Sequence, residues 1–143
     1  MVKVLFDTNI FIDHFSRHMA ATRELATYDD AIISSISWIE VSCTFNEEDK
    51  KDFGSFLVDS DIRVVHMDDD IMRRAGLIRG KSLHIKPKIG LPDCIIRATA
   101  EVLGRIIVTR NPRDFGGEGP QVRVPYEIDP VSLAVVNIRP PLL

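Results

Sequence analysis

The sequence has few cysteines and no long apolar run. Its 143 residues include two cysteines, Cys43 and Cys94, which both fall in segments with a helical pattern. We expect them to be small buried side chains in a reducing cytosol rather than a disulfide framework. No stretch approaches the roughly 18 apolar residues that a membrane span requires. Asp7 also interrupts the apolar N-terminal stretch before it reaches the length of an export signal. These absences predict a cytoplasmic protein without a membrane partner.

Excess positive charge is also missing, since the net charge is −3. An acidic chain is not typical of nucleic-acid-binding proteins. The charges are unevenly distributed, however. Residues 47–70 contain nine acids, whereas residues 71–92 contain no acid and six lysines and arginines. Such asymmetry is compatible with a basic face that binds phosphates, and equally with an ordinary solvated helix followed by a basic loop.

Histidines at metal-binding spacing are lacking as well. The four histidines are scattered and show no zinc-type pattern. We expect His14, His18, His66 and His84 to be surface or packing residues.

The patterns that are present alternate between strands and helices. Length and composition fit one domain spanning residues 1–143. Alternating strands and helices predict an α/β fold, a three-layer α/β/α sandwich around a mainly parallel sheet of four to five strands. Residues 125–143 are rich in proline and have no period, so no element is predicted there. Strands are predicted at residues 2–6, 31–35, 62–66, 105–109 and 121–124, and helices at 9–15, 20–28, from 38, 47–60, around 71–78 and 93–103.

Acidic residues stand where such a sheet places its ligands, at the carboxyl ends of strands. Asp7 ends the first predicted strand, and Asp114 follows the fourth. Asp93 opens the helix that leads to the fourth strand. Asp7 and Asp93 also have an ordinary explanation, because acids at helix starts cap the helix and suit its dipole.

Glu40 lies between apolar residues and admits three interpretations. It can face outward as one polar position of an amphipathic helix. It can form a capping box with Ser37, three residues earlier, at the start of a helix from Trp38. It can also face inward and take part in chemistry.

Taken together, these acids resemble the acidic quartet of the PIN-domain family. The matching elements are Asp7-Thr8-Asn9, Glu40, Asp93 and the segment Thr-Arg-Asn-Pro-Arg-Asp-Phe at residues 109–115, with spacings of 33, 53 and 21 residues between the acids. The resemblance covers about residues 1–115, and within the family the chain looks most like VapC-type toxins of toxin–antitoxin systems.

The resemblance implies a metal-dependent endoribonuclease. It implies that the metal is bound by the catalytic acids Asp7, Glu40, Asp93 and Asp114. Asn111 would assist, or would share the fourth position with Asp114, while Thr8 and Asn9 would orient Asp7 or a metal-bound water. Hard oxygen ligands suit Mg²⁺ or Mn²⁺, and a cation would offset the mutual repulsion of the carboxylates.

The same resemblance implies three partners, namely an RNA substrate, a small antitoxin and a second copy of the chain in a homodimer. Basic residues that border the acids in the sequence are expected to hold the RNA backbone; they are Lys86, Lys88, Arg97, Arg110 and Arg113. The apolar stripe of Phe53, Phe56 and Leu57 would serve either as the dimer surface or as packing against the sheet of the same chain.

Two other functions remain open at this point. The domain could bind RNA or a protein without cutting, or it could be a DNA- or flap-type nuclease with similar acids. A phosphoryl-transfer domain is disfavoured, because no second acid stands two residues after Asp7.

Overall fold

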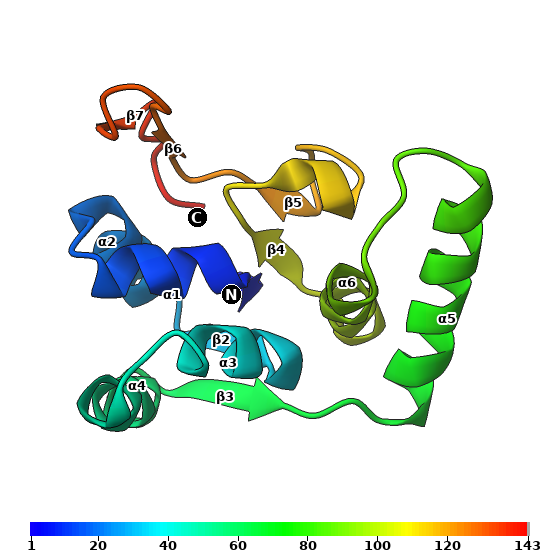
Figure 1. Ribbon diagram of the computed structural model, residues 1–143, viewed down its shortest axis with the longest axis horizontal. Helices are drawn as coiled ribbons and strands as arrows, with labels where there is room; N and C mark the ends of the chain where they lie inside the picture. Colours follow the sequence, from blue (N-terminus) through cyan, green and yellow to red (C-terminus); the bar gives the residue numbers. More distant parts are fainter. Residues whose placement is uncertain (143) are drawn as a thin grey trace.

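Five parallel strands form the central sheet of the computed structural model, which describes residues 1–142 (Figure 1). The strands lie in the order β3-β2-β1-β4-β5, and every neighbouring pair is parallel. The central position of β1 explains its apolar sequence, because Val4, Leu5 and Phe6 are fully buried. The strand bounds are β1 Lys3–Phe6, β2 Asp30–Ser34, β3 Ile62–Val65, β4 Ile106–Val108 and β5 Val122–Arg123.

Helices cover both faces of this sheet. Val4 and Phe6 pack with residues of α1, α2 and α4 on one face, whereas Leu5 packs with residues of α6 on the other. The predicted α/β/α layering around a mainly parallel sheet is therefore confirmed. The helix bounds are α1 Thr8–Phe15, α2 Met19–Thr27, α3 Ser35–Ser42, α4 Glu47–Asp59, α5 Asp69–His84 and α6 Leu91–Leu103, and a short 3-10 turn, η1, spans Pro112–Phe115.

The helix α3 starts earlier than the sequence predicted. Ser34 ends β2 and caps α3, since its Oγ accepts a 3.2 Å hydrogen bond from the Ile36 amide. The predicted capping box of Ser37 and Glu40 is therefore wrong. Glu40 instead lies in the second turn of α3, where its side chain is free to make contacts outside its own helix.

The apolar stripe on α4 packs within the chain. Phe53 and Leu57 are buried in the same cluster as Phe11, and the rings of Phe53 and Phe11 lie 5.8 Å apart. Phe56 is partly buried beside them. Of the two interpretations of this stripe, packing against its own sheet is the one that the structure supports.

The C-terminal segment, for which no element was predicted, forms a short hairpin. β6 (Glu127–Ile128) pairs antiparallel with β7 (Val135–Val136). Ile128 and Val135 contact the main core cluster, and the chain then returns alongside Pro125, whose carbonyl accepts a 2.9 Å hydrogen bond from the Arg139 amide. We name residues 124–142 the C-terminal arm; it lies on the side of the molecule that carries α2 (Figure 1).

The cysteines are both free, but they differ in exposure. Cys94 is buried in α6, as predicted, whereas Cys43 at the end of α3 is exposed. The predicted burial of Cys43 is wrong, because α3 ends at Ser42 and Cys43 belongs to the exposed segment that follows. Among residues 1–142, no helix has both the length and the apolar character needed to cross a membrane.

Candidate active site

Asp7 lies at the junction of β1 and α1 and is only 6% exposed. Its Oδ1 accepts a 2.8 Å hydrogen bond from the Thr8 amide, so the capping role is real. Its Oδ2 accepts hydrogen bonds from Thr109 Oγ1 at 2.8 Å and from Asn9 Nδ2 at 3.3 Å. Burial nevertheless raises the pKa of Asp7, and the nearby charges of Glu40 and Asp114 raise it further. The Asp7 carboxylate thus both caps α1 and belongs to the acidic site.

Thr109 is a site residue that the sequence analysis missed. It is fully buried directly after β4, and its hydroxyl accepts hydrogen bonds from the Asn111 amide at 2.9 Å and from Asn9 Nδ2 at 3.3 Å. The same hydroxyl donates to Asp7. A hydroxyl residue at the end of an apolar strand, just before Arg110-Asn111, was the available signal.

Glu40 reaches the same edge of the sheet from α3. Thr8 Oγ1 donates a 2.8 Å hydrogen bond to Glu40 Oε1, although the two residues are 32 positions apart. This bond directs Glu40 inward, so the outward-facing interpretation is wrong.

Asp93 stands in the first turn of α6, whose N-cap is Gly90, so Asp93 does not cap the helix. Its pKa is raised to about 7. Burial is the largest cause, followed by the charges of Asp7 and Asp114, a hydrogen bond with Asp114 and the charge of Glu40. Asp93 is therefore an electrostatic neighbour of the other three predicted acids.

Asp114 belongs to η1, which buried Phe115 anchors against the sheet. Asn111 Nδ2 donates a 3.3 Å hydrogen bond to Asp114 Oδ2. Asn111 thus contacts Asp114 directly, and which of the two takes the fourth position stays a prediction.

This set of side chains fits a divalent cation. Within residues 1–142, no three acidic, histidine or cysteine side chains are arranged to hold a metal ion as they stand. The acids instead face one another with the pKa of Asp7 and of Asp93 raised, which a bound divalent cation would reverse. Their oxygens are the ligands that Mg²⁺ and Mn²⁺ prefer at sites that keep several waters.

Four of the five predicted basic residues fall into two groups. Lys86, Lys88 and Arg113 line one open hollow, in which Arg113 adjoins Asp114 in the chain. Arg97 pairs with Glu101 at 3.3 Å. The two groups differ in solvent exposure, because Lys86 and Lys88 are exposed whereas Arg97 is partly buried.

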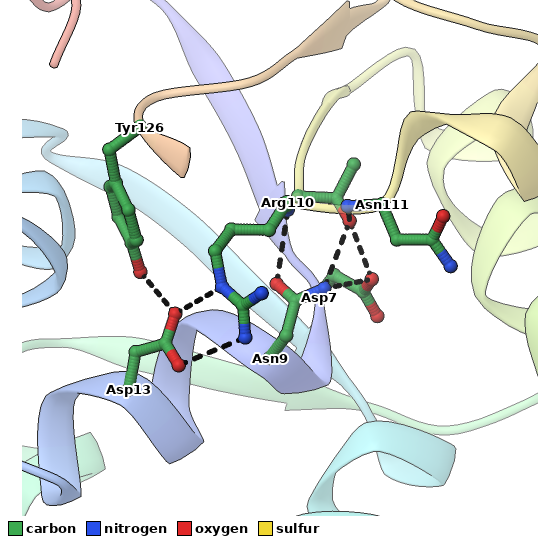
Figure 2. A network of polar contacts seen from close by, with 7 residues as sticks. Asp7, Asn9, Asp13, Arg110, Asn111 and Tyr126 are labelled. Atoms are coloured by element: carbon green, nitrogen blue, oxygen red, sulfur yellow. Dashed lines mark hydrogen bonds and ion pairs between the residues drawn. The ribbon is translucent and has the colours of Figure 1, made fainter. Parts of the chain in front are cut away.

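Arg110 forms an ion pair with Asp13. Its guanidinium makes two hydrogen bonds to Asp13, Nε to Oδ2 at 2.5 Å and Nη2 to Oδ1 at 3.0 Å (Figure 2). Tyr126 Oη donates to the same Asp13 Oδ2 at 2.7 Å. This pairing arises because a buried carboxylate on α1 requires compensation. A contact between Arg110 and RNA stays a prediction.

Comparisons with known proteins identify similar chains. A family model described as the PIN domain matches residues 4–116. A toxin–antitoxin complex from Klebsiella pneumoniae contains a chain with 34% sequence identity and a TM-score of 0.73, and the match covers 88% of this chain and 100% of that one. A comparison with curated proteins gave no match.

Two further solved structures are similar in fold. One is DNA-bound VapBC from Salmonella typhimurium, with 22% identity, a TM-score of 0.68 and coverage of 86% of this chain and 96% of that one. The other is VapBC2 from Rickettsia felis bound to a promoter DNA fragment, with 20% identity, a TM-score of 0.69 and coverage of 81% and 92%.

Proposed function

Because the chain belongs to the PIN-domain family, we propose that it is a metal-dependent endoribonuclease of the VapC type, the toxin half of a toxin–antitoxin pair. The observation that carries the proposal is the mutual proximity of Asp7, Glu40, Asp93 and Asp114. These acids come from four separate segments, and their charges act on one another at the carboxyl edge of the sheet.

The four acids would hold Mg²⁺ or Mn²⁺, with Asp7 at the most buried position. When bound, such a cation polarises a phosphodiester and lowers the pKa of a coordinated water. The chain itself contributes orientation. Thr8 holds Glu40, and Thr109 and Asn9 hold Asp7, so neighbouring side chains orient two of the four carboxylates.

RNA would approach along the hollow formed by Lys86, Lys88 and Arg113. These cations adjoin the acidic site through Arg113 and Asp114, so they fit backbone phosphates on one side of the scissile bond. Arg97, in the second turn of α6, would contribute once RNA competes with Glu101 for its guanidinium.

A small antitoxin is the partner that this function requires, and the similar Klebsiella pneumoniae chain comes from a toxin–antitoxin complex. Trp38 and Ile39 are exposed on α3 just before Glu40. An inhibitor that joins an apolar segment to an arginine or lysine would fit this surface, its cation entering among the acids. We further propose a homodimer, which must use a surface other than the buried stripe of α4.

The decisive experiment compares nuclease activity of the purified chain on RNA and on DNA, with Mg²⁺, with Mn²⁺ and with EDTA. We expect endonucleolytic cleavage of RNA that EDTA abolishes and that Asp93→Asn lacks. Cleavage of DNA alone would identify a DNA nuclease, and RNA binding without cleavage would identify a binding module. Full activity of Asp93→Asn would refute the proposed site.

A further inference from the structure

Arg110 is fixed to α1 at two points. Its backbone amide donates a 3.2 Å hydrogen bond to Asn9 Oδ1, and its guanidinium makes two hydrogen bonds to Asp13. Asn9 and Asp13 lie four residues apart and thus share one face of α1. The two contacts therefore set both the position and the orientation of the loop after β4 relative to this helix (Figure 2).

Tyr126 completes the arrangement from the C-terminal arm. It is 1% exposed and donates its hydroxyl to Asp13, which is 4% exposed. Tyr126 lies beyond residues 4–116, the part that the family model matches. The Asp13 carboxylate is thus fully partnered, and removing either partner leaves buried polar groups without compensation.

The Asn9 carboxamide connects this arrangement to the catalytic acid. Because its Oδ1 accepts from the Arg110 amide, its Nδ2 must point to the other side, toward Asp7 Oδ2 and Thr109 Oγ1. If the loop shifted, the carboxamide would be free to rotate and to present an oxygen to the Asp7 carboxylate. The Arg110 contact therefore selects the orientation that holds Asp7.

We propose that Asp13, Arg110 and Tyr126 form a positioning group for Asp7. The group acts through Asn9 and Thr109 and tunes the affinity of the site for a divalent cation, an inference that rests on the function proposed above. It does not touch the substrate. It restricts the rotation of Asp7, so that its remaining oxygen lone pairs face the other acids.

The chain contains a second group of the same chemistry that serves as an internal control. Glu24 accepts hydrogen bonds from Tyr28 Oη at 2.9 Å and from Arg123 Nε at 2.6 Å and Nη2 at 3.1 Å. Glu24 is 6% exposed, close to the 4% of Asp13. Glu24 and Tyr28 contact none of the four acids by hydrogen bond or ion pair in the described part of the chain.

The test measures the Mg²⁺ and Mn²⁺ dissociation constants of the full chain by calorimetry, alongside thermal stability. Tyr126→Phe and Asp13→Asn should each weaken cation binding about 10-fold. Tyr28→Phe and Glu24→Gln should remain within about twofold of the wild type, as expected for uncoupled sites. All four variants should lose thermal stability, because each removes either a buried carboxylate or one of its hydrogen-bond donors.

A cleavage assay adds a second readout. Raising the Mg²⁺ concentration should restore cleavage by Tyr126→Phe, because the acids themselves are intact. The positioning role would be refuted if the Asp13 and Tyr126 variants and the Glu24 and Tyr28 variants changed cation affinity equally. It would also be refuted if Tyr126→Phe kept the wild-type affinity. If Asp13→Asn does not fold, Tyr126→Phe decides alone, since it removes a single oxygen. A wild-type chain that binds neither cation would instead refute the proposed function itself.

Discussion

Thr8 Oγ1 donates a 2.8 Å hydrogen bond to Glu40 Oε1 and thereby joins the first residue of α1 to the second turn of α3. The neighbouring Thr8 amide donates to Asp7 Oδ1. One residue therefore holds two acids of the site, through its backbone and through its side chain.

Replacing Thr8 by valine should release Glu40 while leaving the bond to Asp7 in place. We expect RNA cleavage to fall about 10-fold or more, because ligand orientation by neighbouring groups contributes that much at metal sites. Thr8→Ser keeps the hydroxyl and should retain most activity. Equal activity of the valine and serine variants would show that the hydroxyl has no role.

Asp93→Asn should stabilise the metal-free protein while abolishing cleavage. The pKa of Asp93 is raised to about 7 in the folded state, above its ordinary value of 3.8. The folded state therefore loses stability as the pH rises through this range, and the neutral asparagine avoids that loss. In EDTA at pH 8 we expect a melting temperature about 2–4 °C above that of the wild type, a small gain because solvent screens a partly exposed carboxylate.

The difference in melting temperature between Asp93→Asn and the wild type should become smaller as the pH falls toward 5, where the wild-type Asp93 carboxyl is protonated. Differential scanning fluorimetry across pH 5–8 provides the measurement, with Asp59→Asn on the exposed side of α4 as control. A destabilised Asp93→Asn protein at pH 8 would contradict the proposed repulsion among the acids.

Asp114→Asn should weaken Mg²⁺ binding more than Asn111→Ala. Asn111 donates to Asp114, whereas Asp114 also acts on Asp93 and Asp7 through its charge. Calorimetric titration of both variants gives the comparison. The reverse order would assign the fourth ligand position to Asn111.

The double variant Lys86→Ala, Lys88→Ala should bind RNA more weakly and with less dependence on salt. Each lost phosphate contact lowers the slope of log affinity against log salt by about 0.7 for a single strand. Fluorescence anisotropy with Asp93→Asn as background prevents cleavage during the titration. Lys51→Ala, at an exposed position of α4, is the control. An unchanged salt slope in the double variant would indicate that the RNA binds elsewhere.

Antitoxin binding and Mg²⁺ should exclude each other. An inserted arginine or lysine would use the same carboxylates as the cation, so raising Mg²⁺ should weaken the complex. Glu40→Gln should weaken it as well, because the mutation removes one charge next to exposed Trp38 and Ile39. Affinity that is indifferent to both changes would indicate an interface away from the acids.

The sequence was sufficient to predict the sheet and the acids at its edge. Strand periodicity and chain order determine which ends meet, and so Asp7, Asp93 and Asp114 could be grouped before any contact was known. Glu40 was grouped correctly, but its place within α3 was wrong. Several serines around residue 35 are suitable helix caps, and only the end of β2 selects Ser34.

Contacts between distant segments were not predictable in the same way. Arg110 resembled a free cation, because its partner Asp13 lies 97 residues away and is buried only in the folded chain. Tyr126 lies in a segment without periodicity, and its burial depends on α1. Polar residues of this kind acquire their role from tertiary packing rather than from local pattern.

The order of strands in the sheet determines when the parts of the site become available during synthesis. β1 lies between β2 and β4, and β4 follows Asp7 by about a hundred residues. A chain that is still being synthesised thus displays Asp7 and Glu40 long before Thr109 and Asp114 exist. The proposed nuclease site therefore remains incomplete until the segment through Asp114 has emerged from the ribosome and β4 has joined the sheet.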